Sequence, residues 1–154
     1  MNDEKHPRYR PVRILPAGPG FRCKVTYRAN LPALRQVEIL QGANNVRAEG
    51  QFERLAVHSA ASDVTFRGNA NELSLKGRAL KADVRLAGAA PRGKVQVEAR
   101  VGSVYLGINQ KAAVSYQLQG ALACFDSGWM NHPDAPLRVN VTGDLLQATL
   151  AYQQ

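Results

Sequence analysis

The chain has 154 residues, a mass of 16.8 kDa, and 20 basic against 12 acidic residues, which give a formal net charge of +8. This length suits one domain, and a content of 45% hydrophobic and 21% charged residues excludes general disorder. Two cysteines exclude a disulfide scaffold, and no apolar run approaches the length of a membrane-spanning helix.

Residues 1–20 form a basic arm that carries four prolines and the candidate polyanion-binding residues Arg8, Arg10 and Arg13. Because proline fixes φ and removes an N–H donor, we predict an extended, flexible arm without helix. The arm suits a tether or an anion-binding tail, and a plain linker has the same composition. As the chain stands, it begins without a secretory signal, so we expect a cytoplasmic location, or an envelope-associated one if the chain is a fragment of a longer protein.

Residues 21–154 are predicted as one domain built from short strands. One set of segments, here called the first strands, places two large apolar residues on one face and one other residue on the opposite face, which indicates half-buried β-strands. These segments are Val37–Ile39, Leu55–Val57, Leu73–Leu75, Val95–Val97 and Val114–Tyr116.

A second set of segments, the second strands, interleaves with the first. A turn-type residue precedes each of them, and glycines mark further corners between the strands. The second strands are Val46–Ala48, Val64–Phe66, Val84–Leu86 and Val104–Leu106.

Equivalent strands recur at intervals of about 20 residues, with two strands per period. This pattern predicts an all-β fold, a single-stranded parallel β-solenoid in which Val46, Val64, Val84 and Val104 stack in one column and Leu55, Leu73, Val95 and Val114 stack in another. Its open ends need covers, which we place near residues 21–36 and 125–154. An antiparallel β-sandwich is the alternative, because it also has short strands at 8–12-residue intervals.

Two segments near the end of this pattern are Gly102–Leu106 and Lys111–Tyr116, followed by Gly120. The chain over about residues 35–150 resembles the toast-rack β-solenoid family of bacterial adhesin-like proteins, in which a small residue followed by Asp or Ser and Val opens one strand after another. The resemblance implies a non-enzymatic envelope or interaction module with no catalytic residues to transfer, and many relatives are exported or membrane-tethered.

The residues that carry chemistry form no catalytic or metal-binding pattern. His6, His58 and His132 lack the spacing of metal ligands, and neither phosphate-binding glycine motif occurs. Cys23 and Cys124 lie far apart in sequence; the sequence leaves open whether they pair, and free thiols are the expected state without an export signal. We therefore predict no enzyme, no cofactor and no metal site.

Two outward surfaces are the candidate sites. On the first strands, Ala56, Ser74, Gln96 and Ser115 predict a flat face with little charge, suited to association with a copy of the chain or with a protein partner, although an ordinary solvated surface has the same composition. On the second strands, Arg47, Arg85 and Tyr105 combine cations with an aromatic ring, as nucleic-acid-binding surfaces do.

Three functions fit these features. The first is a non-catalytic interaction, adhesin-like or self-assembling scaffold module, and we take it as the prediction. The alternative is a basic protein that binds nucleic acid or another polyanion with salt-dependent affinity. The third, an enzyme acting on an acidic polysaccharide, rests on an analogy between β-helical folds alone. The identity of the partner and the oligomeric state do not follow from the sequence.

Overall fold

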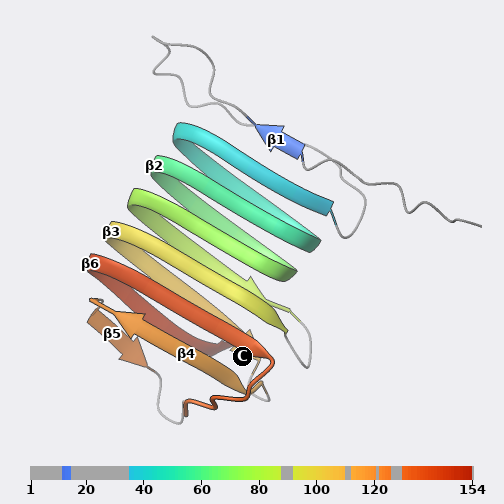
Figure 1. Ribbon diagram of the computed structural model, residues 1–154, viewed down its shortest axis with the longest axis vertical. Helices are drawn as coiled ribbons and strands as arrows, with labels where there is room; N and C mark the ends of the chain where they lie inside the picture. Colours follow the sequence, from blue (N-terminus) through green and yellow to red (C-terminus); the bar gives the residue numbers. More distant parts are fainter. Residues whose placement is uncertain are drawn as a thin grey trace, which may run out of the picture.

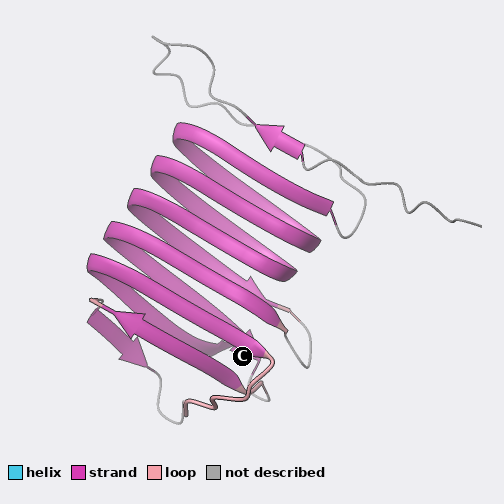
Figure 2. Ribbon diagram, in the orientation of Figure 1, coloured by secondary structure: helices cyan, strands magenta, loops and turns pink. Residues whose placement is uncertain are grey.

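The computed structural model describes residues 12–14, 35–87, 92–109, 112–120, 122–125 and 130–153. These residues form β-strands and connections and contain no helix (Figure 2). The strands are β1 (Val12–Ile14), β2 (Arg35–Leu86), β3 (Gly93–Asn109), β4 (Val114–Gln119), β5 (Leu122–Phe125) and β6 (Leu137–Gln153). The predicted all-β class is therefore confirmed.

The strands pair in parallel, which makes the antiparallel sandwich alternative wrong for the described strands. β1 pairs with residues 37–39 of β2, the end of β2 pairs with β3, and β6 pairs with β3, β4 and β5. Part of the predicted arm thus belongs to strand β1, while Arg8 and Arg10 lie outside the described residues.

Strand β2 is one long strand that winds back on itself (Figure 1). A Cβ atom built on Gly102 meets the carbonyl oxygen of its register partner Leu80, and the same relation joins Gly68 to Gly50 and Gly77 to Ser59. Equivalent residues on neighbouring circuits of β2 are therefore separated in sequence by the same number of residues as Gly50 and Gly68. Ser59 and Gly77 have the same separation. Each circuit contributes one first strand and one second strand to the ladder.

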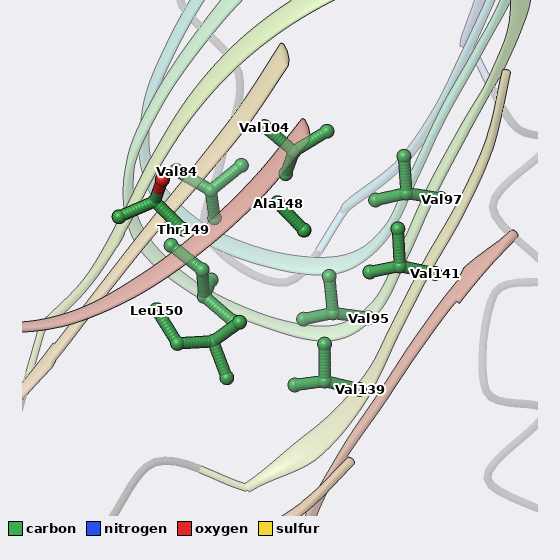
Figure 3. Close-up of a pocket in the computed structure, with 10 residues that line it drawn as sticks. Val84, Val95, Val97, Val104, Val139, Val141, Ala148, Thr149 and Leu150 are labelled. Atoms are coloured by element: carbon green, nitrogen blue, oxygen red, sulfur yellow. The ribbon is translucent and has the colours of Figure 1, made fainter. Parts of the chain in front are cut away.

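The core lies between the layer of first strands and the layer of second strands. Val95, Val97, Val139 and Val141 face Val84, Val104, Ala148 and Leu150, and they leave a void of only about 10 Å³ (Figure 3). That void is at the lower limit for a single water molecule, so the interior is packed by aliphatic side chains and needs no solvent.

The observed register does not stack the valines in the single column that the sequence pattern predicted. Leu73 pairs with Val95, and the same offset continues around the circuit, so Val104 pairs with Ala82 and Val84 pairs with Leu106. Direct stacking of Val84 on Val104 would require the ladder to change its register at a corner, and the register stays constant. The four valines of the predicted column still share one core, because alternation keeps all of them on the inward side, where they are buried.

The order of the circuits also differs from the order in the sequence. Strand β6 lies between β3 and the pair β4 and β5, so that the red ribbon separates the yellow from the orange one in Figure 1. Val114 therefore pairs with Leu137 and not with Val95. The segment 137–153, placed within a terminal cap by the sequence pattern, is an internal strand. The cap predicted near 21–36 lies outside the described residues except for residues 35 and 36.

The terminal strand β4 is partly covered by the segment that leads into β6. Asn131 accepts a hydrogen bond from Tyr116 N–H and donates one to Tyr116 C=O, both at 3.1 Å. His132 N–H donates to the Val114 carbonyl at 3.0 Å. The side-chain amide of Asn131 thus replaces the peptide group of a further strand and blocks this part of the edge.

We expect Gly102→Ala to destabilise the protein by more than about 2 kcal/mol, because Gly102 has a φ of +149° and an added Cβ would collide with the Leu80 carbonyl. Gly42→Ala is the matched control, since nothing lies within 4 Å of a Cβ added there, and its effect should stay within about 0.5 kcal/mol. Urea unfolding measures both. Equal effects of the two substitutions would contradict the tight approach of neighbouring circuits at Gly102.

Asn131→Ala should lower the free energy of unfolding by about 1 kcal/mol, because it removes both hydrogen bonds to the Tyr116 backbone. Asn140→Ala serves as the control: Asn140 is half-buried and has no side-chain hydrogen bond within the described part of the chain. Thermal and urea unfolding give the comparison. A loss that is no larger for Asn131 than for Asn140 would show that this cap does not stabilise the end.

Candidate functional site

The outward side chains of the two layers form two faces. The first-strand face consists of the outward residues of the first strands and of β4, and the second-strand face consists of the outward residues of the second strands. On the first-strand face lie Glu38, Arg54, Ala56, His58, Glu72, Ser74, Lys76, Lys94, Gln96, Glu98, Arg138, Asn140, Ser115 and Gln117; on the second-strand face lie Arg47, Asp63, Thr65, Arg67, Lys81, Asp83, Arg85, Ser103, Tyr105, Gln147 and Thr149.

The predicted association face is not exposed at its centre. Ala56 is only 1% exposed and Ser74 only 5%, so the prediction that both side chains are available to a partner is wrong. Each is flanked on its own strand, two positions away, by longer outward side chains. Ion pairs join these flanking residues to the neighbouring circuit, Arg54 to Glu72 at 3.9 Å and Lys76 to Glu98 of β3 at 3.6 Å. The short segments used for the prediction did not include the flanking positions.

Gln96 and Ser115, the other two predicted association residues, are half-buried and lie in different rows. Gln96 pairs with Asn140, which pairs with Gln117. Ser115 instead pairs with Arg138, because β6 separates β4 from β3. The structure therefore does not bring the four predicted residues together into one flat exposed row.

On the second-strand face, Arg85 and Tyr105 lie close to each other. The Arg85 guanidinium carbon lies 5.7 Å from the centre of the Tyr105 ring. Arg85 also binds Asp83, with Nε 3.1 Å from Oδ1, and this hydrogen-bonded carboxylate raises the pKa of Arg85. Its charge is thus already balanced within the chain, which lowers its value as a contact for an anionic ligand.

The remaining predicted cations do not join this pair. Arg47 is exposed on the first circuit, and two intervening circuits carry Thr65 and Asp83 between it and Tyr105, a separation of about three strand spacings, or ~14 Å. Arg13 lies in β1, where only the backbone is described. Arg8 and Arg10 lie outside the described residues.

A shallow depression of about 430 Å³ lies on the second-strand face beside Tyr105. Small and hydroxyl-bearing residues line it together with Lys81, Asp83 and Tyr105; among them are Thr65, Ser103 and Thr149. The lining mixes both charge signs and is open to solvent, so it lacks the enclosure and the convergent groups that a catalytic pocket needs.

An exposed apolar ridge follows one corner of the ladder, and the sequence analysis did not identify it. Val101 is 51% exposed and Leu145 is 70% exposed, and the two are direct register partners. Ala79 pairs with Val101, and the offset between the circuits of β2 continues the ridge to Ala61 and Ala43, which are also exposed. We call these five residues the apolar ridge. Leu146, next to Leu145 in the chain, is by contrast fully buried.

Two cations also lie side by side on the first-strand face, which the sequence analysis missed as well. Lys94 and Arg138 are register partners on neighbouring strands, and both are exposed. The signal that could have found them is their equivalent position, each directly before an inward valine, once the pairing of β3 with β6 is known.

The residues that the structure describes contain no cluster of side chains that could hold a metal ion. No three of His, Cys, Asp and Glu come together in these ranges. His58 and His132 lie on different elements, His6 and Cys23 fall outside the described ranges, and only the backbone of Cys124 is described, in β5. A search of the described residues for a helix able to cross a membrane finds none.

Comparisons with known proteins identify no relative of this chain. No protein-family model matches the sequence, and neither the curated proteins nor the solved structures give a significant match.

Replacing Asp83 by asparagine should leave the free energy of unfolding nearly unchanged, because solvent screens the ion pair with Arg85 at the surface. Arg85→Gln in the same background then tests coupling between the two residues. A double-mutant cycle by urea unfolding measures the coupling energy. A coupling energy clearly above the error of the measurement would mean that the Arg85–Asp83 pair is a structural element of the second-strand face.

Proposed function

We propose that the chain is a β-solenoid, with each circuit of the ladder as one repeat, and that it works as a non-catalytic interaction module that assembles with copies of itself. The parallel registers and the continuous aliphatic core support the repeat architecture. The resemblance to toast-rack adhesin-like proteins supports a module that acts by contact and not by catalysis.

The observation that carries this proposal is the apolar ridge. Exposed large apolar residues are few in the described part of the chain, namely Val101, Met130 and Leu145, and two of these three are paired in the ladder. Apolar side chains that cluster on an otherwise polar surface mark protein contacts. The faces on either side of the ridge carry ion pairs and polar groups, as the rim of an interface does.

The shape of the apolar ridge favours a second copy as the partner. The ridge widens from alanine in β2 to Val101 in β3 and then Leu145 in β6. Two copies that run in opposite directions would place the wide end of each ridge against the narrow end of the other, which keeps the contact evenly filled. Arg100 and Asp144 flank the wide end as an exposed pair 3.6 Å apart, so charges of both signs are available beside it.

Leu145→Asp should abolish self-association, because it places a charge in the apolar contact. Sedimentation velocity and light scattering at rising protein concentration measure the oligomeric state. We expect the unmodified chain to associate and Leu145→Asp to remain a monomer. Thr142→Asp, an exposed change of similar charge on the same strand, is the control and should associate like the unmodified chain. A strictly monomeric unmodified chain at high concentration would refute self-assembly.

Polyanion binding is the second candidate, and the net charge of +8 favours it. The second-strand face is a weak location for such binding, because Arg85 is paired with Asp83 and Arg47 lies apart from Tyr105. A polyanion site, if the chain has one, needs cations whose charge no neighbouring carboxylate balances.

A further inference from the structure

Lys94 and Arg138 form a pair of adjacent cations that the protein leaves unbalanced. They are direct partners in the parallel ladder, so their backbones are one strand spacing apart, about 4.8 Å. Neither side chain takes part in an ion pair or hydrogen bond in the described part of the chain. Glu72, the register neighbour of Lys94 on its other side, lies 3.9 Å from Arg54 instead.

This arrangement contrasts with that of four other cations of the ladder, whereas Arg47, Arg67, Arg78 and Lys81 have no ion pair among the described residues either. Arg54, Lys76, Arg85 and Arg100 each lie within 4 Å of a carboxylate. Like charges directly opposite each other on neighbouring strands are destabilising. A bound anion between Lys94 and Arg138 would remove this repulsion, so the pair has the electrostatics of a site for an anionic group.

Neutral hydrogen-bonding side chains adjoin the two cations on the side of β4 and one pleat along the strands, whereas Glu72 lies on the far side of Lys94. Ser115 follows Arg138 in the same row. The adjacent row, one pleat along the strands, runs through Gln96, Asn140 and Gln117, and its amides can both donate and accept hydrogen bonds. These groups are half-buried or exposed, and they continue the cationic pair into a polar strip along the ladder.

We propose that this strip, with Lys94 and Arg138 at its centre, binds an acidic polysaccharide. The two cations suit the carboxylate or sulfate groups of such a chain, and the row of amides suits its hydroxyl groups. Single-stranded nucleic acid is the less suitable ligand, because its binding relies on aromatic rings that stack on the bases, and the described outward residues of the first-strand face include no Phe, Tyr or Trp. This inference specifies a ligand and a location for the polyanion candidate and does not depend on association through the apolar ridge.

The test measures binding of the full chain to a sulfated glycan (heparin), a carboxylated glycan (polygalacturonate), neutral dextran and single-stranded DNA by calorimetry at low salt. Lys94→Gln with Arg138→Gln should weaken binding of at least one acidic glycan by about tenfold or more and should reduce its salt dependence. The matched control, Arg47→Gln with Lys81→Gln, removes the same charge from the second-strand face and should weaken binding by less than about threefold. Which of the two acidic glycans binds more tightly identifies the preferred anionic group.

Three results would overturn the proposal: no binding of either acidic glycan, equal weakening by the two double variants, or tighter binding of DNA than of both acidic glycans. The single variant Arg138→Gln tests the same site should the double variant fail to fold, and Arg138→Lys should retain most of the affinity, because the charge is kept. Leu145→Asp should bind the glycan like the unmodified chain. Loss of self-association and loss of glycan binding are therefore separate outcomes.

Discussion

The parallel backbone ladder is the constraint on which the rest of the structure depends. Once one circuit lies in register on the next, every position of the circuit forms a column, and alternation assigns that column to the core or to the surface. Leu73, Val95 and Val139 share a buried column for this reason, although they are far apart in sequence. At Gly77 and Gly102 the neighbouring carbonyl approaches so closely that no side chain fits.

The same constraint determines the chemistry of the surface. It places acidic and basic residues of neighbouring circuits opposite each other at Lys76 and Glu98, and it places two cations together at Lys94 and Arg138. It also aligns the residues of the apolar ridge, which are separated in sequence but continuous in space. The surface features of this protein are thus properties of columns that combine several circuits, and no single segment of the chain contains any of them.

Local alternation was sufficient to predict the all-β class and the inward residues of the short segments from residue 37 on, because these depend on neighbours close in the sequence, but it did not predict β1, β5 or the continuous course of β2. The order of the circuits could not be predicted in this way. Residues 114–118 and 137–141 present the same apolar alternation, so either could lie beside β3. Strand β6 has 17 residues and matches β3 along its full length, whereas β4 has only 6, and the longer ladder accounts for the order that forms. The burial of Ala56 and the row that contains Ser115 both follow from contacts between circuits, which alternation does not describe.

The insertion of β6 also determines which part of the surface can act as an interface. A long strand at the end of a parallel ladder would offer many unpaired backbone groups to another chain. Here the long strand β6 is internal, and the end is formed by the short strands β4 and β5, with Asn131 hydrogen-bonded to the edge of β4. Pairing of β4 or β5 with an edge strand of another chain is therefore disfavoured at this end of the ladder. The two contact regions that we propose, the apolar ridge and the polar strip around Lys94 and Arg138, are accordingly side-chain surfaces and not strand edges.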